Sequence, residues 1–411
     1  MKQIIALLLA LSMALPLVGC GAAKGEAASL TDGLRANPVS LPAIDHFDGS
    51  AAVADLSVKL LQKSEGGESV LVSPVSILYA LAMTMNGAEG ETLRQMEETL
   101  GASRTDLNVF LAGYLRSLPE TKDAVLHLAN SLWLRDEKDR LHVEPDFLQT
   151  NVDLYDAEVF SAPFDKSTVK DINAWAKENT HGMIPEVLDN IPDNVVMYLI
   201  NALSFEAKWL TVYEEAQVRE DVFTTEAGEE QDCELMWSGE SDYIADDNAQ
   251  GFLKHYRGGY AFAALLPREG MTVAEYLATL DGKTLNQMLC TPQEARVTAA
   301  IPKFTGGSAL ELAEVLSDMG MTDLFNAQSC DLTGMGTSED GNLFVSRVLH
   351  KTFIQVDEEG TRAGAVTAGA PAGGCAPPEE RHEVILNRPF VYFLLDTDTM
   401  TPIFMGTYMG M

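Results

Sequence analysis

Two long apolar segments set the first constraint on the fold. Residues 126–134 (LHLANSLWL) and 196–205 (VMYLINALSF) carry apolar side chains at both odd and even positions. A strand of this kind is buried on both faces, so its sheet needs a packed layer above it and another below it. The chain has 411 residues, of which 46% are hydrophobic, which is ample for a large core of this kind.

Helical patterns are frequent in the first half of the chain. Residues 49–63 place apolar side chains on one face and predict an amphipathic helix. Residues 73–92 (SPVSILYALAMTMNGAEGET) start with Ser-Pro, as helices often do, and are apolar almost all round. This pattern predicts a deeply buried helix. Further helices are predicted at 169–179 and 310–319.

Strand patterns are frequent in the second half. Besides the two opening segments, strands are predicted at 69–72, 259–266, 296–304, 344–356, 390–395 and 403–408. Helices followed by strands favour an α+β fold over a wound parallel sheet. Because no repeat and no clear linker divides residues 45–411, we predict one large domain there.

The first twenty residues, MKQIIALLLALSMALPLVGC, are typical of an export signal. Lys2 precedes an apolar stretch that is too short for a comfortable membrane span. The closing LVGC resembles a bacterial lipobox, which implies removal of residues 1–19 and lipid attachment to Cys20. Residues 20–44 then form a tether, and the expected location is outside the cytoplasm, lipid-anchored to the bacterial cell membrane or envelope. The alternative is a plain secretory signal.

Charge and cysteine spacing exclude several classes of function. The net charge of −33 repels phosphate backbones, so no nucleic-acid partner is expected. The cysteines other than Cys20 match no CxxC or zinc spacing, so no metal or cofactor is expected. Most of them are predicted to be free and buried, with disulfide pairing left open: Cys233, Cys290, Cys330 and Cys375.

Residues 357–380 read DEEGTRAGAVTAGAPAGGCAPPEE and contain no large hydrophobic side chain. Three interpretations compete: a linker, a disordered tail, or a loop whose small side chains matter for its function. The residues that follow include the predicted strands 390–395 and 403–408, which are as apolar as a protein core. A tail or an interdomain linker is therefore disfavoured.

From about residue 45 onward the chain resembles a serpin. The resemblance depends on five motifs in the family's order: residues 73–92, INALSFEAKW at 200–209, GMTDLF at 320–325, VLHKTFIQVDEEGT at 348–361, and NRPFVYFLL at 387–395. Ser69 and Arg362 depart from the family's usual residues. The resemblance implies an α+β serpin fold, with helices on three β-sheets, an exposed reactive-centre loop at 357–380, a metastable large sheet and a monomeric state.

The resemblance also implies a function: the protein inhibits proteases and is not itself an enzyme. In the family's inhibitors a protease cuts the loop, whose first half then inserts as a new strand of the main sheet. A strand that enters a packed sheet needs small or β-branched residues on its inner face. The residues of this hinge are Glu358, Glu359, Gly360, Thr361, Ala363, Ala365 and Thr367, the last four of them at the inward positions.

Family spacing places the cut near Gly374–Cys375. The small residues there fit a serine protease with a small or shallow primary pocket, of the elastase-like or subtilisin-like kind. No Lys or Arg lies between Arg362 and Arg381, which disfavours trypsin-like targets. The resemblance further places Ser73, Asn201 and His350 in a polar cluster beneath the strands that must part, a structural role.

Three other functions compete with serine-protease inhibition. One is a non-inhibitory serpin-fold binding protein at the bacterial cell surface, and another is a cross-class inhibitor of cysteine proteases. The third is a cysteine hydrolase that uses Cys375 with His382 or His350. It is disfavoured because a loop of Gly and Pro offers no rigid partner to orient the base.

Overall fold

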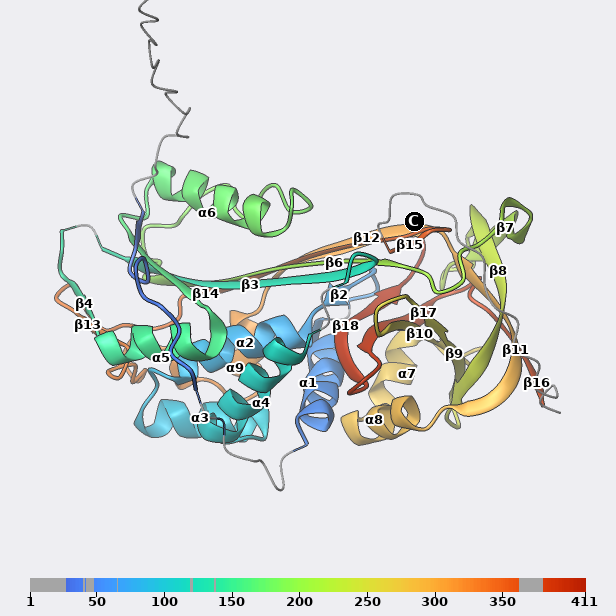
Figure 1. Ribbon diagram of the computed structural model, residues 1–411, viewed down its shortest axis with the longest axis horizontal. Coiled ribbons are helices and arrows are strands. Elements are labelled where there is room, and N and C mark those ends of the chain that lie inside the picture. The colour runs from blue at the N-terminus through green and yellow to red at the C-terminus, as the bar shows by residue number, and fades with distance from the viewer. Residues whose placement is uncertain are drawn as a thin grey trace, which may run out of the picture.

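The structure, a computed structural model, describes residues 27–39, 41, 48–64, 66–118, 121–136, 138–361 and 380–411. Within those ranges the strands form a seven-stranded sheet, a nine-stranded sheet and a two-stranded sheet. Helices cover the seven-stranded sheet on both faces, with α6 on one side and α2, α4 and α5 on the other (Figure 1). The prediction of an α+β fold with helices on three sheets is confirmed.

The seven-stranded sheet has the order β1-β5-β3-β6-β15-β14-β12. Its strands are β1 (Ala28–Ser29), β5 (Glu158–Ala162), β3 (Ala124–Arg135), β6 (Met197–Lys208), β15 (Gly360–Thr361), β14 (Arg347–Val356) and β12 (Phe304–Glu311). β3 and β6 contain the two segments that carry apolar side chains on both faces of the strand. They pair antiparallel at the centre of the sheet, where α2 packs on one side and α6 on the other.

The structure has a helix at each of the four places where one is predicted, but the helix expected at 73–92 ends at Met85, and the other five helices were not predicted. The helices are α1 (Gly49–Ser64), α2 (Pro74–Met85), α3 (Gly90–Leu100), α4 (Arg104–Ser117), α5 (Pro145–Tyr155), α6 (Lys166–Asn179), α7 (Val273–Thr279), α8 (Gly282–Cys290) and α9 (Ala313–Asp318). Short 3-10 turns are η1 (Glu215–Gln217) and η2 (Asp323–Phe325). Every residue of α2 is buried, and its N-terminus is capped by Ser73, whose Oγ accepts from the Ser76 N–H.

The nine-stranded sheet has the order β16-β11-β8-β9-β10-β17-β18-β2, with β7 paired to β8. Its strands are β16 (Arg381–Ile385), β11 (Gln293–Pro302), β8 (Glu230–Ala245), β9 (Ala249–His255), β10 (Tyr260–Pro267), β17 (Phe390–Asp396), β18 (Thr401–Tyr408), β2 (Leu71–Val72) and β7 (Val218–Thr224). The small sheet pairs β13 (Gly336–Ser338) with β4 (Leu141–Val143). β17 and β18 are buried throughout, as their apolar sequence predicts.

The predicted helix at 310–319 is wrong over its first part. Leu310 and Glu311 extend β12, where they pair with His350 and Leu349 of β14, and α9 begins only at Ala313. Pairing along β14 outweighs the local helical pattern, because strand formation depends on the neighbouring strand. The predicted strand at 296–304 likewise divides, since β11 and β12 belong to different sheets.

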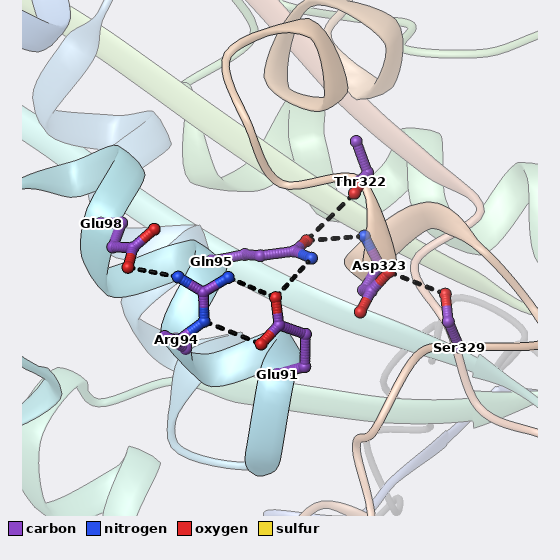
Figure 2. Close-up of polar contacts among 7 residues, drawn as sticks. All are labelled: Glu91, Arg94, Gln95, Glu98, Thr322, Asp323 and Ser329. Atoms are coloured by element: carbon purple, nitrogen blue, oxygen red, sulfur yellow. Dashed lines mark hydrogen bonds and ion pairs between the residues drawn. The ribbon is translucent and has the colours of Figure 1, made fainter.

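The GMTDLF motif is fixed to helix α3 by one side chain. The Gln95 Oε1 accepts from the Asp323 N–H at 2.9 Å and from the Thr322 hydroxyl at 3.2 Å, while its Nε2 donates to Glu91 (Figure 2). Figure 2 also shows Arg94 binding the carboxylates of Glu91 and Glu98. The turn η2 is thereby tied to a helix beneath the large sheet.

Part of the predicted tether lies against the domain. β1 pairs antiparallel with β5 at the edge of the large sheet, and the Leu30 N–H donates to the Val159 carbonyl at 2.7 Å. Farther along, the Asn37 backbone N–H donates to Asp153 of α5 at 2.8 Å. Among the described residues, no helix has both the length and the apolarity to cross a bilayer.

Candidate functional site

β6 and β14 are joined at one end and separated at the other. Residues Tyr198–Ala202 of β6 pair in parallel with residues Arg347–Lys351 of β14. Beyond Lys351 the short strand β15 lies between them, with Gly360 opposite Lys208 and Thr361 opposite both Ala207 and Val356. The sheet therefore accommodates the start of an extra strand at its head, the end where β6 reaches Lys208.

A tight turn connects β14 to β15. The Asp357 carboxylate accepts from the backbone N–H of Glu359 at 2.9 Å and of Gly360 at 3.2 Å, and the Asp357 N–H donates to the Gly360 carbonyl. Gly360 has φ +155°, and a Cβ there would lie 2.1 Å from the Ala207 carbonyl oxygen. Only glycine fits so close to the neighbouring strand.

The segment Trp209–Tyr213, which we call the ledge, holds the backbone of this turn. The Trp209 N–H donates to the Glu359 carbonyl at 3.0 Å, and its indole Nε1–H donates to the Asp357 carbonyl at 2.8 Å. The Tyr213 N–H donates to the Glu358 carbonyl at 3.1 Å. Three consecutive carbonyls of the turn are thus bound by two aromatic residues.

Thr361 points into the protein. Its side chain is 1% exposed, and its hydroxyl lies 2.7 Å from the Tyr256 hydroxyl. Tyr256 in turn stacks on Trp209 with ring centroids 4.1 Å apart. A small side chain is needed at this position, because aromatic rings and β6 surround it. The other predicted hinge residues, Ala363, Ala365 and Thr367, lie outside the described residues.

Other predicted sites also fall outside the described part of the chain. These are the bond Gly374–Cys375 and the lipid attachment residue Cys20. Of the remaining thiols, Cys330 is buried and Cys233 half-buried, and both are free. Cys290 is free and exposed at the end of α8, so of the three described thiols only Cys330 is fully buried.

An ion pair fixes the side chain of Glu358. The Lys303 ammonium lies 2.9 Å from the Glu358 carboxylate and 3.5 Å from that of Glu234. Hydrogen bonds from its own backbone N–H and from Lys303 lower the pKa of Glu358. Sequence reasoning did not assign Lys303, Trp209, Tyr213 or Tyr256 to the site. Trp209 lies in the quoted INALSFEAKW motif, which was the available signal.

Ser73, Asn201 and His350 are brought together at the first turn of α2. His350 accepts the Ser73 backbone N–H on its Nε2 at 2.9 Å, and it lies opposite Asn201 in the β6–β14 register. The Asn201 amide donates to the Ser76 carbonyl at 3.3 Å and to Asn130 at 2.7 Å. The cluster therefore lies under the part of the two strands that is still closed.

The histidine of this cluster is neutral. Burial lowers the pKa of His350 to about 3. Because Nε2 accepts a hydrogen bond, the ring proton is on Nδ1. Within the described chain, that Nδ1, the Asn201 Oδ1 and the Ser76 hydroxyl have no hydrogen-bond partner. Unsatisfied buried groups cost free energy, so this is a weak point of the closed sheet.

Acidification should destabilise the protein through His350. The pKa of about 3 in the folded protein is below the ordinary value of 6.5, so between these two pH values the unfolded chain binds a proton that the folded protein does not. Stability therefore falls as pH falls through this range, by about 2 kcal/mol between pH 7 and pH 5 for this group. Denaturant unfolding at the two pH values should show this additional loss in the parent and not in His350→Gln.

That comparison removes the other titrating groups, which both proteins share. His255 contributes with the opposite sign, because its hydrogen bond to Asp242 raises its pKa, and the stability it adds at low pH is lost as pH rises. An equal pH dependence in parent and variant would contradict the assignment of a buried, neutral His350.

Comparisons with known proteins agree with this geometry. The family description "Serpin (serine protease inhibitor)" matches residues 51–411. The leukocyte elastase inhibitor of Xenopus tropicalis is 32% identical over 372 residues, which cover 86% of this chain and 96% of the relative. That relative is named as an inhibitor and not as an enzyme.

A solved structure is still more similar. The thermophilic serpin tengpin in its native state is 44% identical, with a TM-score of 0.88 over 94% of this chain and 100% of the other. The same serpin in its latent state matches with 41% identity and a TM-score of 0.79, over 90% of this chain and 100% of the other. The chain belongs to the serpin family.

Proposed function

We propose that this protein inhibits serine endopeptidases by trapping them as covalent adducts. The observation that carries the proposal is the position of β15, which already lies between β6 and β14, where an inserted strand would begin. A cut in the loop, near Gly374–Cys375, would free the chain after Thr361 to continue along that path. The protease, attached to the freed end as an acyl-enzyme, would then be carried along the sheet.

The energy available for trapping follows from the backbone pairs that insertion would add. The register between β6 and β14 ends at Ala202 and Lys351, so the strands beyond that point can receive a partner. Each ladder bond contributes ~0.5–1.5 kcal/mol net, and on the order of fifteen bonds would give ~10–20 kcal/mol before entropy. Displacing one oxyanion-hole donor costs a protease ~3–4 kcal/mol. Insertion therefore releases enough to distort an active site.

The loop sequence indicates the kind of target. The residues near the proposed cut, Ala372, Gly373, Gly374 and Cys375, are all small. They fit a protease with a small or shallow primary pocket, and the Xenopus relative is named as an inhibitor of leukocyte elastase. Lipid on Cys20 would hold this inhibitor at the outer side of a membrane, where proteases from the surroundings first reach the cell.

The test is to mix the mature protein with an elastase-like protease, a subtilisin-like protease, a papain-like cysteine protease and trypsin, each in a separate reaction. The first two should give an adduct that survives SDS, and mass spectrometry should place the cut near Gly374–Cys375. Trypsin is the matched control, because no Lys or Arg lies between Arg362 and Arg381. Cleavage without any adduct would instead support a non-inhibitory binding protein, and an adduct formed only with a cysteine protease would support cross-class inhibition.

A further inference from the structure

A lysine is buried beside the ledge. Lys254 belongs to β9 and is 3% exposed, and its ammonium lies 3.0 Å from the carboxylate of Glu240 on β8. The Glu240 side chain is itself only 13% exposed. Lysine and glutamate are rarely buried to this extent in proteins. The proposed trapping mechanism uses neither Lys254 nor Glu240.

The ammonium is enclosed by aromatic rings. The Lys254 Nζ lies 4.3 Å from the centre of the Tyr213 ring and 5.3 Å from the centre of the Trp209 ring. The Ser238 hydroxyl donates to the Glu240 carboxylate at 2.6 Å and lies 3.4 Å from the Tyr213 hydroxyl. We call these five residues the lysine box.

The two rings of the box are the two residues that hold the hinge. Trp209 and Tyr213 donate their backbone N–H groups to the carbonyls of Glu359 and Glu358. A cation held against an aromatic face attracts it, and more strongly where water is excluded. The Lys254 ammonium therefore attracts the rings at both ends of the ledge, those of Trp209 and Tyr213. Lys254 acts on the hinge through these two residues, whose backbone N–H groups bind it.

Stability alone does not explain this charge. Replacing a buried ion pair by apolar residues of similar volume is often neutral or stabilising, so a methionine at Lys254 with a neutral residue at Glu240 would be an adequate core. Such an apolar pair would lack the cation beside the Trp209 and Tyr213 rings. The charge therefore contributes by fixing the position of the ledge.

We propose that Lys254 is a positioning residue for loop insertion. It orients Trp209 and Tyr213 so that the turn Asp357–Gly360 stays in register when the freed chain extends β15. Without it the turn frays, Thr361 leaves its place beside Tyr256, and insertion starts more slowly. More of the acyl-enzyme would then hydrolyse before it is trapped. This inference rests on the proposed function for its consequence, but its structural part does not.

The test uses amide hydrogen exchange of the whole protein without any protease. In Lys254→Met/Glu240→Gln, no unpaired charge is left in the core, yet the cation is gone. The backbone amides of Trp209 and Tyr213 should exchange at least fivefold faster than in the parent, while those of α2 stay unchanged. Lys254→Arg, which keeps a cation beside the rings, should exchange as slowly as the parent.

A neighbouring ion pair supplies the control. His255 and Asp242 lie on the same two strands, 2.8 Å apart and partly exposed, and outside the lysine box. Asp242→Asn should leave exchange at the ledge within twofold of the parent. If the double variant also stays within twofold, or if Lys254→Arg exchanges as fast as the double variant, the positioning role is wrong.

The functional consequence is measured separately, as the ratio of adduct to cleaved product. The double variant should yield at least threefold less adduct per cleavage, with Lys254→Arg and Asp242→Asn close to the parent. If the parent forms no adduct with any protease, the proposed function fails, while the exchange result still decides the role of Lys254. Fast exchange with an unchanged adduct ratio would show that the ledge is held by Lys254 but does not control insertion.

Discussion

Thr361→Arg should convert the protein from an inhibitor into a substrate. Thr361 is 1% exposed and contacts the Tyr256 hydroxyl, so a guanidinium there would be buried without a partner. A buried unpaired charge costs several kcal/mol, so the arginine would keep β15 out of its place between β6 and β14, and the freed chain could not insert behind it. We expect the adduct yield to fall at least tenfold in an SDS gel assay with an elastase-like protease. Cleavage of the loop should continue at nearly the parent rate.

Thr361→Ser is the matched control, because it keeps the hydroxyl that meets Tyr256 and adds no bulk. It should trap within twofold of the parent. Equal trapping by Thr361→Arg and the parent would show that Thr361 does not lead an inserting strand, and loss of cleavage in the variant would point to a folding defect instead. Circular dichroism of each variant separates that case from a specific effect on trapping.

The sequence predicted the elements whose pattern is local and long. β3 and β6 were found because apolar residues occur at both faces, and α2 because it is apolar all round and starts at Ser73-Pro74. The described part of β15, Gly360–Thr361, is too short to have a pattern of its own. It is a strand because β6 and β14 flank it and Gly360 can approach Ala207, which are facts of tertiary structure.

The ledge and the lysine box show why the rest of the site could not be predicted. Lys254 occupies one position in a short apolar run, where a lysine is usually read as exposed. Its burial depends on Glu240 and Tyr213, which come from other parts of the chain. By contrast, Ser73, Asn201 and His350 were grouped by resemblance, and the structure brings them together around the start of α2.

Cutting the loop should raise the thermal stability of the protein. In the intact chain β6 and β14 still pair directly from Tyr198 to Ala202, and these closed pairs cover a polar cluster with unsatisfied groups among the described residues. A cut near Gly374–Cys375 would let the chain fill the sheet. The ~10–20 kcal/mol of new ladder bonds, before the entropy of ordering the strand is subtracted, sets an upper limit of roughly 10–25 °C on the rise in Tm for a domain of this size.

The cut has to be made without trapping the protease. A zinc metalloprotease is suitable, because it activates a water molecule and forms no acyl-enzyme. Cys375→Leu would give such an enzyme a large apolar side chain to recognise, which the loop otherwise lacks, and differential scanning calorimetry before and after the cut would measure Tm. Thr361→Arg in the same background is the control: it should be cut at the same place and gain little stability, since its strand cannot enter the sheet. An unchanged Tm in the cut parent would mean that the native sheet stores no energy, and trapping by insertion would then have no driving force.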